Sequence, residues 1–557
     1  MEGFDNYMKK YSLGIDFGTL SGRAALIDLE TGEEAASDVL EYGHGVMSEI
    51  LCDGKTMLPP KTALQNPQDY IDVLKTTIPN VIKKSGVKPT DIIGVGVDFT
   101  ACTLIPTDKY GKPLCFYEKY KSRPHAYAKL WKHHSAQKMA DRFNELANKR
   151  KEKFLKYYGG KISSEWLFPK VMQILEEDEE IYNAADKFIE AGDWIVQLLT
   201  GQEKRSICQA GYKAAWNEDM GYPSKAFLKE LNPGLENVAA EKLSCALCKP
   251  TECVGTITKD AANLTGLCEG TAVSAAIIDA HAALPAAGIT TPGNLLMIMG
   301  TSACHIILSD KESFVKGVAG VVKDGIIPGY YAYEAGQACV GDHFEWFVKN
   351  AVPYSYYIEA ENTGENIYSL LERKAKTLKP GESGLVALDW FNGSRILSDS
   401  DLSGVVLGYT LQTKPEEIYR ALIEATAFGT RMIIETFEQG GIDVNELIAA
   451  GGLPQKNDML MQIYADITNR PIRIVKSTQS CAAGAAIFGA VAAGEKNGGF
   501  GDIAAASERI SGFLEKVYKP NEENVKLYDK IYDEYKDLHK YFSEENEIMK
   551  KIGRKKK

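Results

Sequence analysis

Short apolar runs joined by Gly-rich turns recur along this chain of 557 residues. The stretch Ser12–Asp28 (SLGIDFGTLSGRAALID) is apolar, turns through Gly18 to Gly22, and becomes apolar again, which predicts a β-hairpin. Leu295–Ser309 (LLMIMGTSACHIILS) repeats this strand–turn–strand pattern, and its turn carries no neighbouring aspartate. The pattern therefore predicts two similar hairpins about half a chain apart.

Longer periodic stretches separate the apolar runs. Pro67–Lys84 has apolar residues at helical spacing, and Asp91–Leu104 has the β-branched composition of a buried strand. We expect one long helix over Tyr120–Lys156, another over Ala184–Thr200, and a helix of small residues over Cys481–Gly494. This alternation of strands and helices indicates an α/β fold.

The repeated hairpin also predicts the domain organisation. A chain of this length exceeds the usual size of one domain. Gly288–Asn294 (GITTPGN) has the composition of a linker. We therefore expect an N-terminal domain over residues 1–288, a C-terminal domain over 289–545, and a basic tail over 546–557.

Composition and charge narrow the class of protein. The 45% hydrophobic and 25% charged residues are ordinary for a globular chain, and the net charge of −11 argues against nucleic acid as the main partner. No segment approaches the ~18 uninterrupted apolar residues of a membrane span, and no signal peptide precedes the first strand. Scattered cysteines in apolar stretches fit reduced thiols. We expect a cytoplasmic protein that binds neither nucleic acid nor membrane.

Three stretches carry candidate chemistry. The turn with Gly18 and Thr19 can point N–H groups at a phosphate, and Asp16 beside it can hold a hydrated Mg²⁺. Gly451 and Gly452 follow a strand and precede Asn457, an arrangement suited to adenosine against bare backbone. Asp279 stands among small apolar residues, where a carboxylate is costly to bury without a function or partner.

Each of these features also has a structural interpretation. Most Gly-rich hairpins are only turns, and a Gly-Gly turn before a helix can simply pack the helix on a sheet. Short motifs are hypotheses that depend on their context. The order of the motifs along the chain supplies that context.

Both hairpins, the linker and the Gly-Gly turn, in this order, resemble the FGGY family of carbohydrate kinases from Ser12 to about Tyr541. Ser403–Glu424 resembles the family's second signature. The most specific similarity, to members that act on L-ribulose, lies in seven stretches: DFGTLSGRA (Asp16–Ala24), GVDFTAC (Gly96–Cys102), LWKHHSAQ (Leu130–Gln137), GGKISSEW (Gly159–Trp166), DAHA (Asp279–Ala282), GTSACH (Gly300–His305) and DWFNGSR (Asp389–Arg395).

The resemblance implies a fold of two ribonuclease-H-like, actin-like ATPase domains with a cleft between them. It implies transfer of phosphate from ATP to L-ribulose in L-arabinose catabolism, with Asp279 as general base. Ala101, Lys213, Asp279 and Glu334 would line the sugar. Asp16 would be the water-mediated Mg²⁺ partner, and the expected ATP-binding residues are Gly18, Thr19, Gly300, Thr301, Ser302, Gly451, Gly452 and Asn457.

Other activities remain open at this point. Another sugar or polyol kinase of the family could act on D-ribulose, xylulose or glycerol, because pocket shape decides stereochemistry. An actin- or chaperone-type ATPase would need a peptide-binding module or filament contacts, and no separate β-rich module follows the second half. The expected partners are a small sugar and ATP, with a homodimer as the candidate assembly.

Overall fold

The computed structural model describes residues 9–243, 246–397, 399 and 402–552, and these form two compact units. The first unit comprises Met1–Thr290, Gly320–Ala332 and Gln479–Gly512. The second comprises Thr291–Ala319, Tyr333–Thr478 and Phe513–Lys557. Two segments from the second half of the sequence thus belong to the first unit. The last five residues of the expected basic tail, 553–557, lie outside the described residues.

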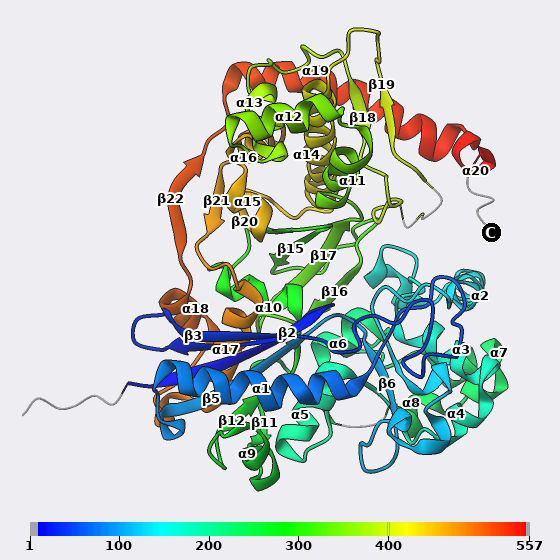
Figure 1. The fold of residues 1–557 in the computed structure, drawn as a ribbon. Helices are drawn as coiled ribbons and strands as arrows, with labels where there is room; N and C mark the ends of the chain where they lie inside the picture. The colour runs from blue at the N-terminus through cyan, green and yellow to red at the C-terminus, as the bar shows by residue number, and fades with distance from the viewer. Residues whose placement is uncertain (1–8, 244–245, 398, 400–401, 553–557) are drawn as a thin grey trace, which may run out of the picture. The chain divides into compact units, whose positions relative to one another are not determined.

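The first unit is built on a mixed sheet in which β1 lies between β5 and β2. Helix α1 (Pro67–Ser85) runs beside β2 and β3 of this sheet (Figure 1). β1 pairs antiparallel with β2, as the hairpin pattern predicts, and parallel with β5. The strand order is β11-β12-β5-β1-β2-β3, with β13 beside β5. The strands are β1 (Tyr11–Phe17), β2 (Ser21–Asp28), β3 (Glu34–Glu41), β5 (Ile92–Phe99), β11 (Cys253–Thr256), β12 (Ala272–Ser274) and β13 (Ile277–Ile278).

Side chains of different size point to the two faces of this sheet because successive residues of a strand alternate between faces. The large residues of β1 and β5 form one face, where Phe17 stacks on Phe99 with ring centroids 4.9 Å apart. Helix α1 (Pro67–Ser85) covers it through Tyr70 and Val73, which are fully buried. The predicted amphipathic helix is confirmed.

Glycine and serine occupy the other face, and helix α17 (Ser480–Ala493) packs directly on it. A Cβ placed on Gly14 of β1 would overlap the carbonyl oxygen of Ala482, and one on Gly96 of β5 would overlap that of Ala485. The Ser12 hydroxyl donates to the Ala486 carbonyl over 2.7 Å. The helix therefore lies against sheet backbone, which only residues without a side chain permit.

Helix α17 holds a second helix in the same way. A Cβ on Gly484 would overlap the carbonyl oxygen of Ala282 in α10 (Asp279–Ala286). The predicted helix of small residues is thus confirmed, and it is packed on two sides within the first unit.

A smaller sheet in the first unit has the strand order β4-β7-β6-β8. The predicted helix over Tyr120–Lys156 is wrong, because α2 occupies only Gln137–Arg150. Pro124 starts a 3₁₀ turn upstream, and the buried residues that follow it form β7. The predicted helix over Ala184–Thr200 is also shorter, since β8 pairs with β6 before α5 begins. The elements are β4 (Leu64–Gln65), β6 (Leu104–Thr107), β7 (Ala128–Lys129), β8 (Lys187–Glu190), α3 (Leu167–Glu177), α5 (Ala191–Thr200) and α6 (Ile207–Lys213).

The second unit has its own sheet, in the order β17-β15-β14-β20-β21-β22. β14 and β15 form the second predicted hairpin, and β20 runs parallel to β14. The strands are β14 (Asn294–Met299), β15 (Ala303–Ser309), β17 (Tyr331–Gln337), β20 (Glu446–Ala450), β21 (Ile472–Val475) and β22 (Phe513–Tyr518). The main helices are α11 (Gly341–Ala351), α14 (Pro415–Gln439), α16 (Asp458–Thr468) and α19 (Glu522–Lys540).

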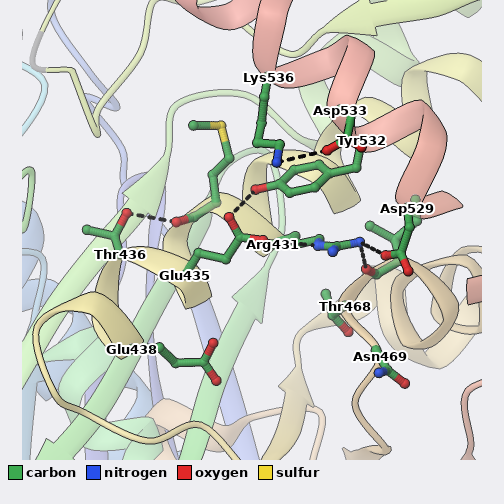
Figure 2. Close-up of polar contacts among 12 residues, drawn as sticks. Arg431, Glu435, Thr436, Glu438, Thr468, Asn469, Asp529, Tyr532, Asp533 and Lys536 are labelled. Carbon is green, nitrogen blue, oxygen red and sulfur yellow. Dashed lines mark hydrogen bonds and ion pairs between the residues drawn. The ribbon is translucent and has the colours of Figure 1, made fainter.

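Polar and aromatic contacts fasten α19 to α14 (Figure 2). Arg431 of α14 donates to Asp529 over 2.7 Å, and its guanidinium lies 4.1 Å from the ring centroid of Tyr532. The Tyr532 hydroxyl donates to Glu435 over 2.9 Å. Polar side chains of α14 and α19 therefore find their hydrogen-bond and cation–π partners on the other helix.

The remaining elements complete the two units. In the first these are α4 (Glu179–Ala184), α7 (Lys225–Leu231), α8 (Val238–Lys242), α9 (Lys259–Thr265), α18 (Ile503–Ile510), β9 (Lys204–Ser206), β10 (Ala246–Cys248) and β16 (Gly320–Lys323). In the second they are α12 (Tyr354–Thr363), α13 (Ile367–Ala375), α15 (Gly452–Lys456), α20 (Ile548–Ile552), β18 (Val386–Leu388) and β19 (Val405–Leu407).

We predict that Gly96→Ala destabilises the protein, because the new methyl group would overlap the backbone of α17. Overpacking of this kind costs about 1–3 kcal/mol, and more where the neighbour is backbone that cannot rotate away. The control is Gly43→Ala, whose Cβ would meet its nearest atom at an ordinary 3.7 Å. Thermal unfolding should show a clear drop in Tm for Gly96→Ala only, and equal Tm values for the two variants would contradict the packing described.

Candidate functional site

The turn between β1 and β2 is held from several sides by the first unit. The N–H of Gly18 donates to the Ser21 carbonyl over 3.0 Å, which closes the turn. The Gln65 amide donates to the carbonyl of Thr19 over 2.7 Å, and the Trp131 indole N–H donates to the Thr19 hydroxyl oxygen over 3.0 Å. Both the backbone and the side chain of Thr19 are therefore hydrogen-bonded within the first unit.

Three aspartates gather at the carboxyl ends of neighbouring strands in the first unit. Asp16 of β1 and Asp98 of β5 are partners in the parallel register. Asp279 follows β13, whose Ile277 is in register with Asp98. Parallel strands end at the same edge of a sheet, so the register alone brings these three carboxyl groups together.

Burial gives this cluster unusual electrostatics. Asp98 is fully buried, and burial together with the negative charges of Asp16 and Asp279 raises its pKa well above the ordinary range. Burial also raises the pKa of Asp16, opposed by Arg23, whose Nε lies 3.2 Å from the Asp16 carboxylate. Among the described residues, no N–H or O–H donates to either oxygen of Asp98. The negative charges of Asp16 and Asp279 therefore oppose ionisation of Asp98.

The sequence did not single out Asp98, although its motif was noted. The sequence did contain a signal for Asp98, because β1 and β5 each have a glycine followed two residues later by an aspartate. Gly14 and Asp16 occupy the same face as Gly96 and Asp98, and the two glycines receive α17. Two strands with glycine followed two residues later by aspartate indicate a tight helix contact beside paired acids.

Asp279 is the first residue of α10 and is only partly buried. One of its oxygens accepts the backbone N–H of Ala280 over 2.7 Å. All three aspartates also help to raise the pKa of the Cys481 thiol, after burial as the main cause. The three carboxyl groups thus lie near the first turn of α17.

The two other sugar-site candidates of the first unit lie near one another. Ala101 is in the loop that follows β5, and Lys213 ends α6 with 5% of its surface exposed. The Lys213 ammonium is 5.8 Å from the ring centroid of Trp166. It is also close enough to Cys102, beside Ala101, to act against the rise in that thiol's pKa that burial causes.

Two further buried carboxyl groups adjoin this region. Burial, reinforced by Asp193, raises the pKa of Glu190 to about 8. Burial likewise raises the pKa of Asp193 to about 7, although Asp193 accepts the Ser206 N–H over 3.0 Å. Among the described residues, no hydrogen-bond donor reaches either oxygen of Glu190.

The second unit contains its own anchored turn, Gly300–Ser302. The Gly300 N–H donates to the Ser302 carbonyl over 2.9 Å, in the way that Gly18 closes the first hairpin. The start of α11 holds the turn from outside, because the N–H of Gly341 donates to the Gly300 carbonyl and that of Val340 to the Thr301 carbonyl, over 2.9 and 2.8 Å.

Gly451 and Gly452 lie beside this turn, because β14 and β20 are parallel and Ile298 is in register with Ala450. Gly451 has φ +101°, and a Cβ on it would overlap the Met299 carbonyl. A Cβ on Gly452 would meet no atom within 4 Å. The first glycine is therefore required by the fold, and the second borders open space.

The structure gives Asn457 a structural contact. Its side-chain oxygen accepts the Leu460 N–H over 2.8 Å and so caps α16. Glu334 lies in the middle of β17, partly buried, and its carbonyl accepts the Ala319 N–H over 2.7 Å. Within the first unit, the structure brings together Asp16, Gly18, Thr19 and Asp279. Within the second unit, it brings together Gly300, Thr301, Ser302, Gly451 and Gly452.

The donor chemistry near Asp16 fits a hard cation held through water. Carboxylate oxygens suit Mg²⁺, which keeps several of its own waters. Over the described residues, no group of three or more His, Cys, Asp and Glu side chains is arranged to hold a metal directly. None of the helices in those residues is long and apolar enough to span a membrane.

Comparisons with known proteins cover nearly the whole chain. Residues 11–285 match the N-terminal domain and residues 295–493 the C-terminal domain of the FGGY family of carbohydrate kinases. A ribulokinase from Bacillus licheniformis is 55% identical over 534 residues, covering 96% of this chain and 97% of that protein. A ribulokinase from Geobacillus thermodenitrificans is 53% identical, covering 98% of this chain and 97% of that protein.

Solved structures show the same fold at low sequence identity. A xylulose kinase from Rhodospirillum rubrum superimposes with a TM-score of 0.77 at 22% identity, covering 95% of this chain and 98% of that one. A glycerol kinase from Plasmodium falciparum, solved with ADP, gives a TM-score of 0.76 at 18% identity over the same shares. The predicted α/β fold with two actin-like domains is confirmed.

We predict that Glu190→Gln stabilises the protein increasingly as the pH rises. The folded protein holds the Glu190 proton up to a pKa of about 8, whereas an unfolded chain releases it near the ordinary 4.5. The stability that this proton contributes is complete below pH 4.5 and is lost as the pH rises through 8. Glutamine stays neutral throughout and avoids that loss.

Thermal unfolding between about pH 5 and 9 checks this prediction. The Tm of Glu190→Gln minus that of the parent protein should grow with pH. The control is Glu361→Gln at an exposed position. A Tm difference for Glu190→Gln that stays constant over this range would show that the carboxyl group is not held neutral.

Proposed function

Because this chain belongs to the FGGY family of carbohydrate kinases, we propose that it transfers the γ-phosphoryl group of ATP to O5 of L-ribulose, as a step of L-arabinose catabolism. The observation that carries this proposal is the 55% and 53% identity to ribulokinases over nearly the full length of both chains. The product would be L-ribulose 5-phosphate, and ADP would be released.

Asp279 is proposed as the general base. A sugar hydroxyl is a weak nucleophile, and a carboxylate that accepts its proton during attack typically contributes about 10²–10⁴-fold in rate. Asp279 is partly exposed, so a substrate can reach it, and the Ala280 N–H holds one of its oxygens in place. The neighbouring Asp98 is fully buried and is therefore a poorer candidate.

Ala101, Lys213 and Glu334 are proposed to bind the sugar. Lys213 supplies a donor and Glu334 an acceptor for hydroxyl groups, while Ala101 contributes backbone and a small surface. Fixing the sugar in this way would hold the reactive oxygen in line with the phosphoryl group.

Both anchored turns and the Gly-Gly turn are proposed to bind ATP, with Asp16 contacting Mg²⁺ through water. The N–H groups of Gly18, Thr19 and Gly300–Ser302 would neutralise phosphate charge, and Mg²⁺ would supply further charge stabilisation there. Gly451, Gly452 and Asn457 are assigned to the adenosine. The domain boundaries 1–288 and 289–545, the cytoplasmic location and the homodimer stay predictions.

The direct experiment measures ADP release with L-ribulose, D-ribulose, L-xylulose, D-xylulose and glycerol, and without sugar. The proposal expects the highest kcat/KM with L-ribulose. A preference for another of these acceptors would assign the chain to a different activity in the same family. ADP release of equal rate without sugar would favour a conformational ATPase.

We predict that Asp279→Asn lowers kcat on L-ribulose by about 10²–10⁴-fold while leaving the affinity for MgATP nearly unchanged, because the base acts only in the transition state. The matched control is Asp260→Asn, an exposed aspartate that also lies in the first turn of a helix. Steady-state kinetics, MgATP titration and Tm should be measured together. A near-normal kcat for Asp279→Asn would end the base assignment, and weakened MgATP binding would favour a metal-holding role.

We predict that Gly452→Val weakens ATP binding more than sugar binding. The added side chain would extend into open space, so the fold should tolerate it while a nucleotide base or ribose should not. The comparison variant is Gly451→Ala, which combines φ +101° with a backbone overlap and should lower Tm. Gly452→Val with an unchanged KM for ATP, or with equal losses for both substrates, would contradict the adenosine assignment.

A further inference from the structure

Lys170 is a fully buried lysine at the fourth position of α3. Its ammonium donates to three backbone carbonyls, those of Cys102 over 2.6 Å, Leu130 over 3.0 Å and Lys129 over 3.4 Å. No step of the proposed mechanism uses this side chain. A buried ammonium is costly, so three aligned acceptors on two separate segments call for an explanation.

The first of the two segments is the loop after β5, which carries Ala101. Cys102 adopts φ +47°, a left-handed conformation that is rare for residues other than glycine and costs free energy. Its carbonyl is the acceptor of the shortest of the three bonds from Lys170. The ammonium thus stabilises the strained residue directly beside Ala101.

Other contacts hold the ends of this loop. The hydroxyl oxygens of Thr100 and Thr103 lie 2.9 Å apart and join the two ends to each other. The N–H of Thr100 donates to the Phe17 carbonyl over 3.1 Å, and the N–H of Ala191 donates to the Thr103 carbonyl over 2.7 Å. The loop is therefore tied at both ends, and Lys170 reaches the residue between them.

The second segment ends β7 and leads to Trp131. Lys170 binds the carbonyls of Lys129 and Leu130, the two residues just before it. Trp131 in turn donates to the hydroxyl oxygen of Thr19 in the phosphate turn. That turn has further support from Gln65, which donates to the Thr19 carbonyl, so it depends on Lys170 only in part.

We propose that Lys170 is a positioning residue for the sugar site: it holds the left-handed Cys102 and thereby presents Ala101 to the acceptor sugar. The proposal rests on the proposed function, since it takes Ala101 as part of the sugar site. The ammonium contacts no substrate. It acts by fixing the distance between the loop after β5 and the end of β7.

The test replaces Lys170 with methionine, which keeps most of the chain length and removes the donors. We expect KM for L-ribulose to rise about tenfold or more, because charge-assisted hydrogen bonds are lost. KM for ATP should change far less, since Gln65 still supports the phosphate turn. The control is Lys242→Met, a half-buried lysine that donates to the Ala185 carbonyl elsewhere in the same unit.

A rescue experiment with glycine at position 102 distinguishes a positioning role of Lys170 from a role in core packing alone. Glycine adopts positive φ without steric cost, so adding Cys102→Gly to Lys170→Met should restore part of the sugar affinity, beyond the effect of Cys102→Gly alone. A role in core packing predicts a lower Tm, equal changes in both KM values, and no rescue. Either the absence of rescue or equal changes in the two KM values would overturn the proposal.

A second variant keeps the proposal testable if Lys170→Met does not fold. Cys102→Val leaves Lys170 intact but places a β-branched residue where φ is positive, which disfavours the left-handed conformation. It should raise KM for the sugar selectively, and a normal KM would overturn the proposal. If the parent enzyme prefers another sugar, the proposed acceptor is wrong, and the same variants measured with that sugar still decide the role of Lys170.

Discussion

The backbone contact between α17 and the sheet of the first unit is the constraint on which the candidate site depends. Glycines on β1 and β5 let the helix approach until its carbonyls lie where side chains would otherwise be. The same helix receives α10, which begins at Asp279. Asp16 and Asp98 continue the glycine face of their strands, so one close contact fixes three carboxyl groups on three elements.

The three aspartate carboxyl groups lie close together but differ in burial and in the charges around them. Asp98 is fully buried, and its pKa is raised by burial and by its acidic neighbours, whereas Asp16 has Arg23 within 3.2 Å. Asp279 keeps partial exposure at the start of a helix. Paired groups in unlike environments are a common basis for dividing acid, base and metal-binding roles. The second unit follows a similar plan, because an anchored turn lies beside a Gly-Gly turn at the ends of two parallel strands.

The sequence predicted the elements that have a strong local signature. Both hairpins, α1 and α17 were predicted because apolar periodicity and turn residues are local signals, carried by a few neighbouring positions. The prediction of one long helix over Tyr120–Lys156 was wrong. The charged residues at helical spacing were given more weight than Pro124, which starts a 3₁₀ turn, and the two-residue strand β7 has no pattern of its own. Strand pairing with β6 is a tertiary contact that no local pattern reports.

The same limit applies to the site. Asp279 was visible as a carboxylate in an apolar segment, but Asp98 acquires its meaning from the register of two strands more than 80 residues apart in sequence. The contact of Lys170 with Cys102 and Leu130 likewise joins segments that only the fold brings together. Gly451 and Gly452 are equivalent in the sequence pattern. Only the structure shows that backbone occupies the space where a Gly451 side chain would lie, whereas the space beside Gly452 is open.

The most direct test of the central claim is to locate the phosphoryl group in the product formed from ATP and L-ribulose. Phosphorus–carbon coupling in the NMR spectrum of the purified product identifies the carbon that bears the phosphate. The account predicts a coupling to C5 and stoichiometric ADP. A phosphate on another carbon, or inorganic phosphate in place of a sugar phosphate, would contradict it.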